Sequence, residues 1–228
     1  MCRLICIYAK LLLLLHGMLK IAIWDDMSQC TEAEVKRMMP LVNEQRRQQA
    51  LQYKHVFGQY CCLRSWLMLQ NLLGHTPSEW RYNAHGKPFL TGEEANTYFS
   101  ISHCREAIAV AIADQEVGID IESIRPAKTE LVARVMNEEE QAQISQSANP
   151  DRMFTHLWTQ KEAIVKWQGT GIEGMEKMND VRRTMYDVPF TMYEGRCTKD
   201  DVRCETIEKE KYIYTIIYGK LHCISAEI

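Results

Sequence analysis

Two acidic residues interrupt the apolar run VGIDIE at residues 117–122, and their spacing could hold a metal ion. Residues two apart on a strand point to the same face, so the side chains of Asp120 and Glu122 project together, about 7 Å apart at their Cα atoms, whereas Ile119 and Ile121 face the core. Two neighbouring carboxylates repel each other, and a shared hard cation relieves that repulsion. Mg²⁺ fits best, because it takes a few carboxylates and completes its shell with water and substrate phosphate. The alternative is an edge strand with two acids on its solvated face.

A predicted helix supplies a third carboxylate and a lysine. It begins at Asn149, which can cap the first turn, and Pro150 suits the first helical position. Glu162 and Lys166 lie one turn apart on a common flank, where Glu162 could be a third oxygen ligand and Lys166 a phosphate partner. The alternative is an ordinary helix ion pair, which stabilises by only about 0.2–0.5 kcal/mol. The expected buried stripe comprises Phe154, Leu157, Trp158, Ile164 and Val165.

Polar residues follow a short strand in Phe99-Ser100-Ile101-Ser102-His103. The two hydroxyls and the imidazole could form an anion site, whereas a hydrolase nucleophile would need the strand–turn–helix context of G-x-S-x-G, which is missing. The alternative is a strand end with polar turn residues. Upstream, Gly86-Lys87-Pro88 presents a lysine in a turn whose direction Pro88 fixes, and an ordinary turn is the other interpretation.

Composition and charge limit the class of protein. The chain has 228 residues, 46% of them hydrophobic and 25% charged, which is ordinary for a globular protein of one domain or two small halves. The net charge of −3 gives no whole-molecule attraction to nucleic acid or anionic membrane, so phosphate binding must come from a local basic cluster.

Nine cysteines without a C-x-x-C pair favour free thiols in a reducing cytosol, and no Cys/His spacing is typical of a zinc site.

The amino terminus carries an apolar run, Leu11–Leu15, that is too short to span a bilayer, which takes about 20 apolar residues. A signal peptide is an alternative, but no small-x-small cleavage site follows. We expect the folded protein to begin near Met18, with Lys20–Trp24 as its first strand. Residues 1–17 are then an extension or a mis-set start.

The elements that must position these residues form two α+β halves, residues 18–116 and 117–228. In the first half, the sequence predicts a short helix opened by Thr31 and ending before Pro40, a long helix over Asn43–Leu73 ended by Gly74, and strands around Phe89, at Tyr98–Ser102 and at Ala107–Ala113. In the second half, it predicts helices at Glu130–Val135 and Glu138–Ser145, the helix after Asn149, and a hairpin of Lys211–Tyr218 with Leu221–Ala226 around Gly219-Lys220.

In this order, GKPFL, FSISH, VGIDIE and LWTQKEAIVKWQGTGI resemble the motifs of the 4′-phosphopantetheinyl transferases, in particular the larger surfactin-synthetase-activating type. The resemblance covers Met18 to Ile228 in layout and is most specific at these motifs. It implies an α+β fold of two similar α/β halves related by a pseudo-twofold axis, with the active site in the cleft between them. It also implies a holo-[acyl-carrier-protein] synthase type of enzyme, which moves phosphopantetheine from coenzyme A to a serine of an apo acyl or peptidyl carrier protein with Mg²⁺ and releases 3′,5′-ADP.

The resemblance assigns roles to individual residues. It makes Asp120, Glu122 and Glu162 the magnesium ligands, Glu162 a candidate base, and Lys166 the lysine beside the coenzyme A pyrophosphate. The other residues that it assigns to coenzyme A binding are Arg46, Arg47, Lys54, Lys87, Pro88, Ser102 and His103.

The resemblance also implies partners and a location. We expect a cytoplasmic monomer that binds coenzyme A and a carrier protein, and neither nucleic acid nor membrane. The carrier would meet the stretch Glu173–Thr206, where four methionines form either an adaptable contact surface or part of the core: Met175, Met178, Met185 and Met192. Two alternatives stay open: a metal-dependent phosphohydrolase that uses the same acids, and a module that binds coenzyme A or carrier protein without turnover.

Overall fold

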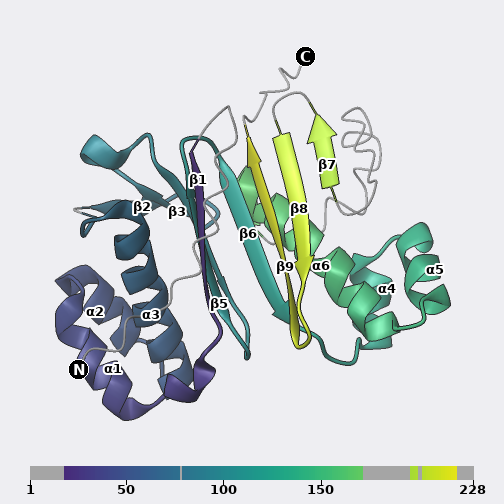
Figure 1. Ribbon diagram of the computed structural model, residues 1–228, viewed down its shortest axis with the longest axis horizontal. Coiled ribbons are helices and arrows are strands. Elements are labelled where there is room, and N and C mark those ends of the chain that lie inside the picture. Colours follow the sequence, from purple (N-terminus) through teal and green to yellow (C-terminus); the bar gives the residue numbers. More distant parts are fainter. Residues whose placement is uncertain (1–17, 78, 172–195, 200–201, 220–228) are drawn as a thin grey trace.

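The computed structural model describes residues 18–77, 79–171, 196–199 and 202–219 (Figure 1). It is a mixed α+β structure, as predicted, and its sheets are antiparallel. One sheet has the strand order β1-β5-β4 and the other has the order β6-β9-β8-β7. A small ribbon, β2-β3, accompanies the first sheet.

The first sheet and its helices come from residues 19–113. Helix α1 begins where the Thr31 hydroxyl accepts a hydrogen bond from the Glu34 amide, and α3 ends at Gly74 in the left-handed conformation that glycine favours. Both boundaries agree with the sequence. The elements are β1 (Leu19–Trp24), α1 (Glu32–Met38), α2 (Glu44–Leu51), α3 (Val56–Leu73), β2 (Trp80–Tyr82), β3 (Pro88–Leu90), β4 (Tyr98–His103) and β5 (Ile108–Ala113).

The predicted long helix over Asn43–Leu73 is wrong, because the structure divides it into α2 and α3. Helix α2 ends at Leu51, and α3 starts again at Val56 after a connection of exposed residues. The ring of Tyr53 folds back onto Gly58, whose missing Cβ would lie 2.6 Å from that ring. The contact with Tyr53 therefore needs a glycine in the first turn of α3. The break in the chain between the two helices lets α2 fold back onto α3.

The second sheet and its helices come from residues 117–219. Asn149 caps α6 through the Arg152 amide, and Pro150 occupies the first turn, as predicted. The elements are β6 (Val117–Ser123), α4 (Thr129–Val135), α5 (Glu138–Gln146), α6 (Pro150–Gln168), β7 (Arg196–Lys199), β8 (Val202–Glu208) and β9 (Tyr212–Gly219).

The predicted hairpin of Lys211–Tyr218 with a following strand is wrong. Strand β9 pairs along its whole length with β6 on one side and with β8 on the other, so both of its edges are occupied. The hairpin is formed with the preceding strand β8 instead. Residues 221–226, the four methionines between residues 175 and 192, and residues 1–17 all lie outside the described part of the chain.

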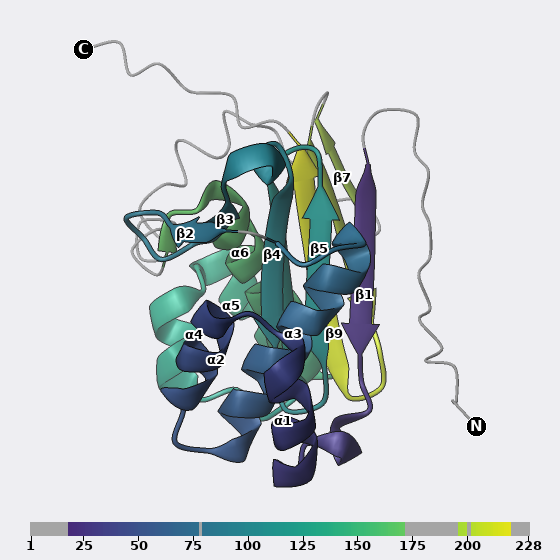
Figure 2. The ribbon, with the colours of Figure 1, turned by 90° about the vertical axis from the view of Figure 1, so that its left-hand side faces the viewer.

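Strands β5 and β6 are buried on both faces, because each sheet packs between two neighbours. One face of the first sheet packs on α3, and its other face packs on β6 and β9 of the second sheet. The second sheet carries α6 on its far face. In Figure 1 both sheets run through the centre, with α1–α3 on the left and α4–α5 on the right; Figure 2 views the molecule from the α1–α3 side.

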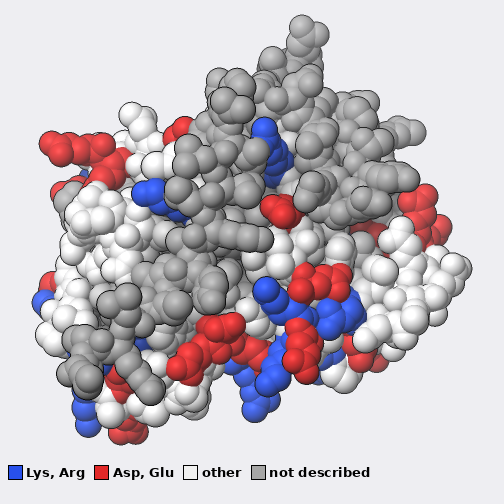
Figure 3. All heavy atoms as spheres, viewed as in Figure 1, with Lys and Arg blue, Asp and Glu red and all other residues white. Residues whose placement is uncertain are grey.

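Charge is distributed without a dominant sign. On the described part of the face in Figure 3, Lys and Arg side chains are interspersed with Asp and Glu. Among the described residues, no helix combines the length and the apolar character that crossing a bilayer requires. The thiols of Cys30, Cys61, Cys62 and Cys104 form no disulfide.

Candidate active site

The candidate site centres on Asp120, in the middle of β6 and only 3% exposed. Its Oδ1 atom accepts a hydrogen bond from Ser102 Oγ at 2.8 Å and pairs with Lys166 Nζ at 2.6 Å. The same ammonium donates to Ser102 Oγ at 2.8 Å, which closes a triangle of three polar groups. Its members come from β4, β6 and α6, so the structure brings together residues that lie 64 positions apart. The burial of Asp120 rules out the alternative interpretation, in which both acids lie on the solvated face of an edge strand.

Helix α6 reaches this position because Gly118 lets it lie directly on β6. A Cβ atom at Gly118 would stand 2.1 Å from the carbonyl oxygen of Ala163 and 2.4 Å from the amide nitrogen of Trp167. Any side chain at residue 118 would therefore push the helix away from the strand. Because Ala163 lies between Glu162 and Lys166 on the same turn, this contact sets the distance of both site residues from Asp120.

The carboxyls of Glu122 and Glu162 complete an acidic group around Asp120. Burial, followed by repulsion from Asp120, raises the pKa of Glu162 to about 7, although Lys166 acts in the opposite direction. The same two causes raise the pKa of Glu122, while Arg125, Lys166 and a hydrogen bond from Trp158 lower it. The carboxyls of Glu122 and Glu162 are therefore both close enough to Asp120 for its charge to act on them.

A cation would relieve this repulsion, and the donor chemistry fits Mg²⁺. The Oδ2 atom of Asp120 is buried without a hydrogen-bond partner, which leaves one carboxylate oxygen for a ligand. Carboxylate oxygens are the ligands that Mg²⁺ prefers. Within the described ranges, however, no group of three or more His, Cys, Asp or Glu side chains is arranged to hold an ion. The other oxygen of Asp120 pairs with Lys166.

The serines and the histidine of FSISH face this centre in different ways. Ser100 Oγ accepts a hydrogen bond from the Ile119 amide at 3.0 Å, which satisfies a backbone donor on the open edge of β6. Ser102 binds Asp120, as described above. His103 is exposed at the end of β4, 5.9 Å from the ring of Phe57. The protein around its ring and the positive charge of Lys166 lower the pKa of His103, which favours the neutral imidazole.

Arg46, predicted to bind phosphate, lies inside the molecule. It is 7% exposed, and all three guanidinium nitrogens donate to protein acceptors. Those acceptors are the Cys62 carbonyl oxygen, Ser65 Oγ and Gln49 Oε1. Arg46 therefore holds α2 against α3 with four of its five N–H donors.

Arg47 and Lys54 are more accessible. Arg47 pairs with Glu44 on its own helix at 2.7 Å and donates to the Val42 carbonyl oxygen at 2.8 Å. Lys54 is exposed in the connection between α2 and α3. Of the predicted basic segment, these two residues are the ones that could meet a phosphate from solvent.

Lys87 and Pro88 line a pocket together with Glu162 and Lys166. Its other walls come from β4 and from the loop after α6, including Ser100, Ile101 and Gly169. The turn at Lys87 thus faces the acidic centre across a pocket. The ammonium of Lys87 points elsewhere: it donates to Glu116 Oε2 at 2.7 Å and to the Trp167 carbonyl oxygen at 3.0 Å.

Sequence reasoning missed Gly118, Trp158 and Glu116 as parts of the site. Gly118 had a signal, because a glycine inside a strand often marks the close approach of another backbone. Trp158 was expected only in the buried stripe, although an indole N–H in such a place needs a hydrogen-bond partner. Glu116 precedes the VGIDIE run and carries no local pattern that would single it out.

Comparison with known proteins supports the resemblance that the motifs suggested. Residues 116–217 match the model of the 4′-phosphopantetheinyl transferase superfamily, and this range contains Asp120, Glu122, Glu162 and Lys166. The resemblance to this superfamily is thereby confirmed for the C-terminal part of the chain.

Individual relatives carry the same description. The chain is 40% identical over 113 residues to the 4′-phosphopantetheinyl transferase AcpT of Escherichia coli O157:H7, covering 46% of this chain and 57% of that protein. It is 30% identical over 139 residues to the transferase gsp of Aneurinibacillus migulanus, covering 58% and 57%. It is 25% identical over 150 residues to the transferase Sfp of Bacillus subtilis strain 168, covering 62% and 66%. The chain thus spans less than two thirds of the length of these relatives.

Proposed function

We propose that this protein is a 4′-phosphopantetheinyl transferase that moves phosphopantetheine from coenzyme A to a serine of an apo acyl or peptidyl carrier protein. The observation that carries the proposal is the meeting of Asp120, Ser102 and Lys166 beside Glu162, within a segment that matches the superfamily. A pocket lined by Glu162, whose pKa is raised, and by Lys166, which pairs with the buried carboxylate of Asp120, is suited to phosphoryl transfer, because that chemistry depends on positioning and charge.

The proposed fold relation follows from strand order. Each half runs strand, helices and antiparallel strands, and the first strand pairs with the last in both: β1 with β5, and β6 with β9. We infer that residues 18–116 and 117–228 are two similar halves related by a pseudo-twofold axis. The coenzyme would lie in the cleft between them, where the turn at Lys87 and strand β4 face α6.

The proposed reaction assigns work to each side chain. The serine hydroxyl of the carrier attacks the β-phosphorus of coenzyme A, and the bond to the bridging oxygen breaks, so that 3′,5′-ADP leaves with that oxygen. Glu162 is the candidate base that takes the serine proton. Lys166 stabilises negative charge on the phosphate oxygens. Ser102 orients the carboxylate of Asp120, and His103 with Arg47 and Lys54 borders the adenosine phosphate.

Magnesium is the proposed cofactor. Asp120, Glu122 and Glu162 would hold Mg²⁺, which supplies Lewis-acid stabilisation of the pyrophosphate when bound. The unpaired Oδ2 atom of Asp120 supports this assignment.

The proposed setting is the cytoplasm, where coenzyme A and carrier proteins meet and where thiols stay reduced. Cys61 and Cys62 agree with that setting, because both thiols are buried within α3. We propose a monomer, since two halves in one chain supply both walls of the cleft. We propose coenzyme A and a carrier protein as its partners, and neither nucleic acid nor membrane.

The test is the intact mass of an apo acyl carrier protein after incubation with the protein and coenzyme A, in Mg²⁺ and in EDTA. We expect a gain of one phosphopantetheine unit only with Mg²⁺, and none with Asp120→Asn. Phosphate release from small esters without modification of a carrier would favour a phosphohydrolase. Coenzyme A binding without any carrier modification, tried on acyl and peptidyl carriers, would favour a binding module.

A further inference from the structure

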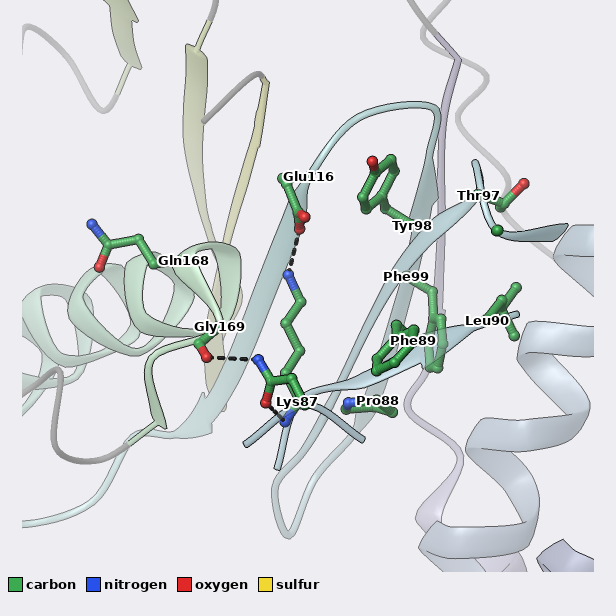
Figure 4. A pocket seen from close by; sticks show the side chains of 12 residues that line it. Lys87, Pro88, Phe89, Leu90, Thr97, Tyr98, Phe99, Glu116, Gln168 and Gly169 are labelled. Carbon is green, nitrogen blue, oxygen red and sulfur yellow. Dashed lines mark hydrogen bonds and ion pairs between the residues drawn. The ribbon is translucent and has the colours of Figure 1, made fainter. Parts of the chain in front are cut away.

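Lys87 ties two parts of the molecule together across the cleft. Its ammonium stands at 2.7 Å from Glu116 Oε2 (Figure 4). It also lies 3.0 Å from the Trp167 carbonyl oxygen, so two of its three N–H donors are used. Glu116 lies just before β6, and Trp167 lies in the last turn of α6. One side chain from the turn before β3 thus holds both elements that carry the acidic centre.

A second contact runs parallel to the first. The side-chain amide of Asn83 donates to the Gly169 carbonyl oxygen at 2.9 Å, and the Asn83 oxygen accepts from the amides of His85 and Lys87. Asn83 therefore shapes the turn that presents Lys87 and binds the end of α6 at the same time. Gly169 has a left-handed backbone, and a Cβ there would lie 3.0 Å from the Asn83 amide nitrogen, so the two segments are in close contact.

Glu116 is a fixed anchor for this contact. Its carbonyl oxygen accepts a hydrogen bond from the Gly219 amide at 3.0 Å, which holds it next to the end of β9. The ion pair is partly shielded, with 17% of the Lys87 side chain and 30% of the Glu116 side chain exposed. A pair that is fixed at one end and partly shielded loses less to entropy and screening than a mobile surface pair.

The same contact separates two pockets. The pocket that contains Glu162 and Lys166 and a neighbouring pocket lined by Phe89, Tyr98 and Glu116 share Lys87, Pro88, Phe99 and Gly169 as walls. In Figure 4 the Lys87 side chain extends toward Glu116 across the neighbouring pocket. The aliphatic part of the Lys87 side chain therefore forms part of the wall between the two pockets, and its ammonium group points toward Glu116.

We propose that Glu116 is a positioning residue of the coenzyme pocket, which acts through Lys87 by holding the turn at residues 86–88 against α6. The inference rests on the proposed function for its ligand, coenzyme A. It assigns Lys87 to the closure of the pocket instead of to a direct phosphate contact.

The experiment compares Lys87→Met, Glu116→Gln and the exchanged pair Lys87→Glu with Glu116→Lys in the full chain. We expect each single variant to raise the Kd of coenzyme A, measured by calorimetry, and its KM by about three- to tenfold, with kcat nearly unchanged. The double variant Lys87→Met with Glu116→Gln should weaken binding no more than either single change, because both remove the same contact. The exchanged pair should recover part of the affinity, because it restores the ion pair but not the hydrogen bond to the Trp167 carbonyl oxygen.

Asp114→Asn is the matched control, because Asp114 is an exposed acid in the same connection between β5 and β6. It should leave Kd and KM unchanged. If Lys87 binds a phosphate directly, Glu116→Gln will leave the affinity unchanged or improve it, and the exchanged pair will bind worst; either result overturns the proposal. The failure of the proposed function would look different, since the wild-type protein would then modify no carrier at all.

Discussion

Replacing Glu162 by glutamine should stabilise the metal-free protein while it removes activity. The carboxyl of Glu162 has its pKa raised from 4.5 to about 7 by burial and by repulsion from Asp120. A shift of this size corresponds to about 3.4 kcal/mol for a fully buried group. Glu162 is only half-buried, and solvent screening reduces the effect, so we expect about 1–2 kcal/mol.

The sign of the effect depends on pH. The folded protein holds the proton of Glu162 between pH 4.5 and about 7, whereas the unfolded chain has released it. The free energy of unfolding of the wild type therefore falls as pH rises through this window, and glutamine does not titrate. The advantage of Glu162→Gln should be absent below pH 4.5 and complete above pH 7.

Urea denaturation in EDTA at pH 4.5 and pH 8 measures this difference directly. Glu139→Gln, on the exposed side of α5, is the control and should show no such pH dependence. In a second measurement at pH 8, Mg²⁺ replaces EDTA. It should raise the urea midpoint of unfolding of the wild type and raise that of Glu162→Gln much less. A Glu162→Gln variant that is no more stable at pH 8, or equally more stable at both pH values, would refute the reasoning.

Three further predictions concern residues that support the site. Gly118→Ala puts a Cβ 2.1 Å from a carbonyl oxygen of α6, so it should destabilise by about 1–3 kcal/mol in urea and slow transfer by roughly 100-fold. Trp158→Phe removes a hydrogen bond to Glu122 and should weaken Mg²⁺ binding about tenfold by calorimetry, with little change in unfolding. Lys161→Met breaks a buried ion pair with Glu140 at 2.8 Å and should cost about 1–3 kcal/mol in thermal unfolding; an unchanged midpoint would contradict this.

The parts of the fold that the sequence predicted have local causes. Thr31 and Asn149 cap helices with their own side chains, and Gly74 ends one with a backbone conformation that other residues avoid. The alternation of isoleucines and acids in VGIDIE predicted that Ile119 and Ile121 face the core, and both are fully buried. These signals lie within a few residues of the feature that they control, so a single sequence is enough to read them.

The features that the sequence did not reveal depend on which side chains meet once the chain has folded. Arg46 looks like a surface cation next to Arg47, and only the packing of α2 on α3 commits its donors to Cys62. The break between α2 and α3 depends on Tyr53 meeting Gly58, and the tie between Lys87 and Glu116 spans 29 positions. Periodicity identifies which face of an element is buried, but it does not say which partner buries it.

Strand β5 carries small side chains where the two sheets meet. Ala109, Ala111 and Ala113 are at most 1% exposed, and they lie in one apolar cluster with Ile119 of β6 and Ile216 of β9. Because this cluster draws on both sheets, cutting the chain between them would leave each fragment with an uncovered apolar face. The two halves should therefore melt in one cooperative transition, and neither should persist as an autonomous folding unit.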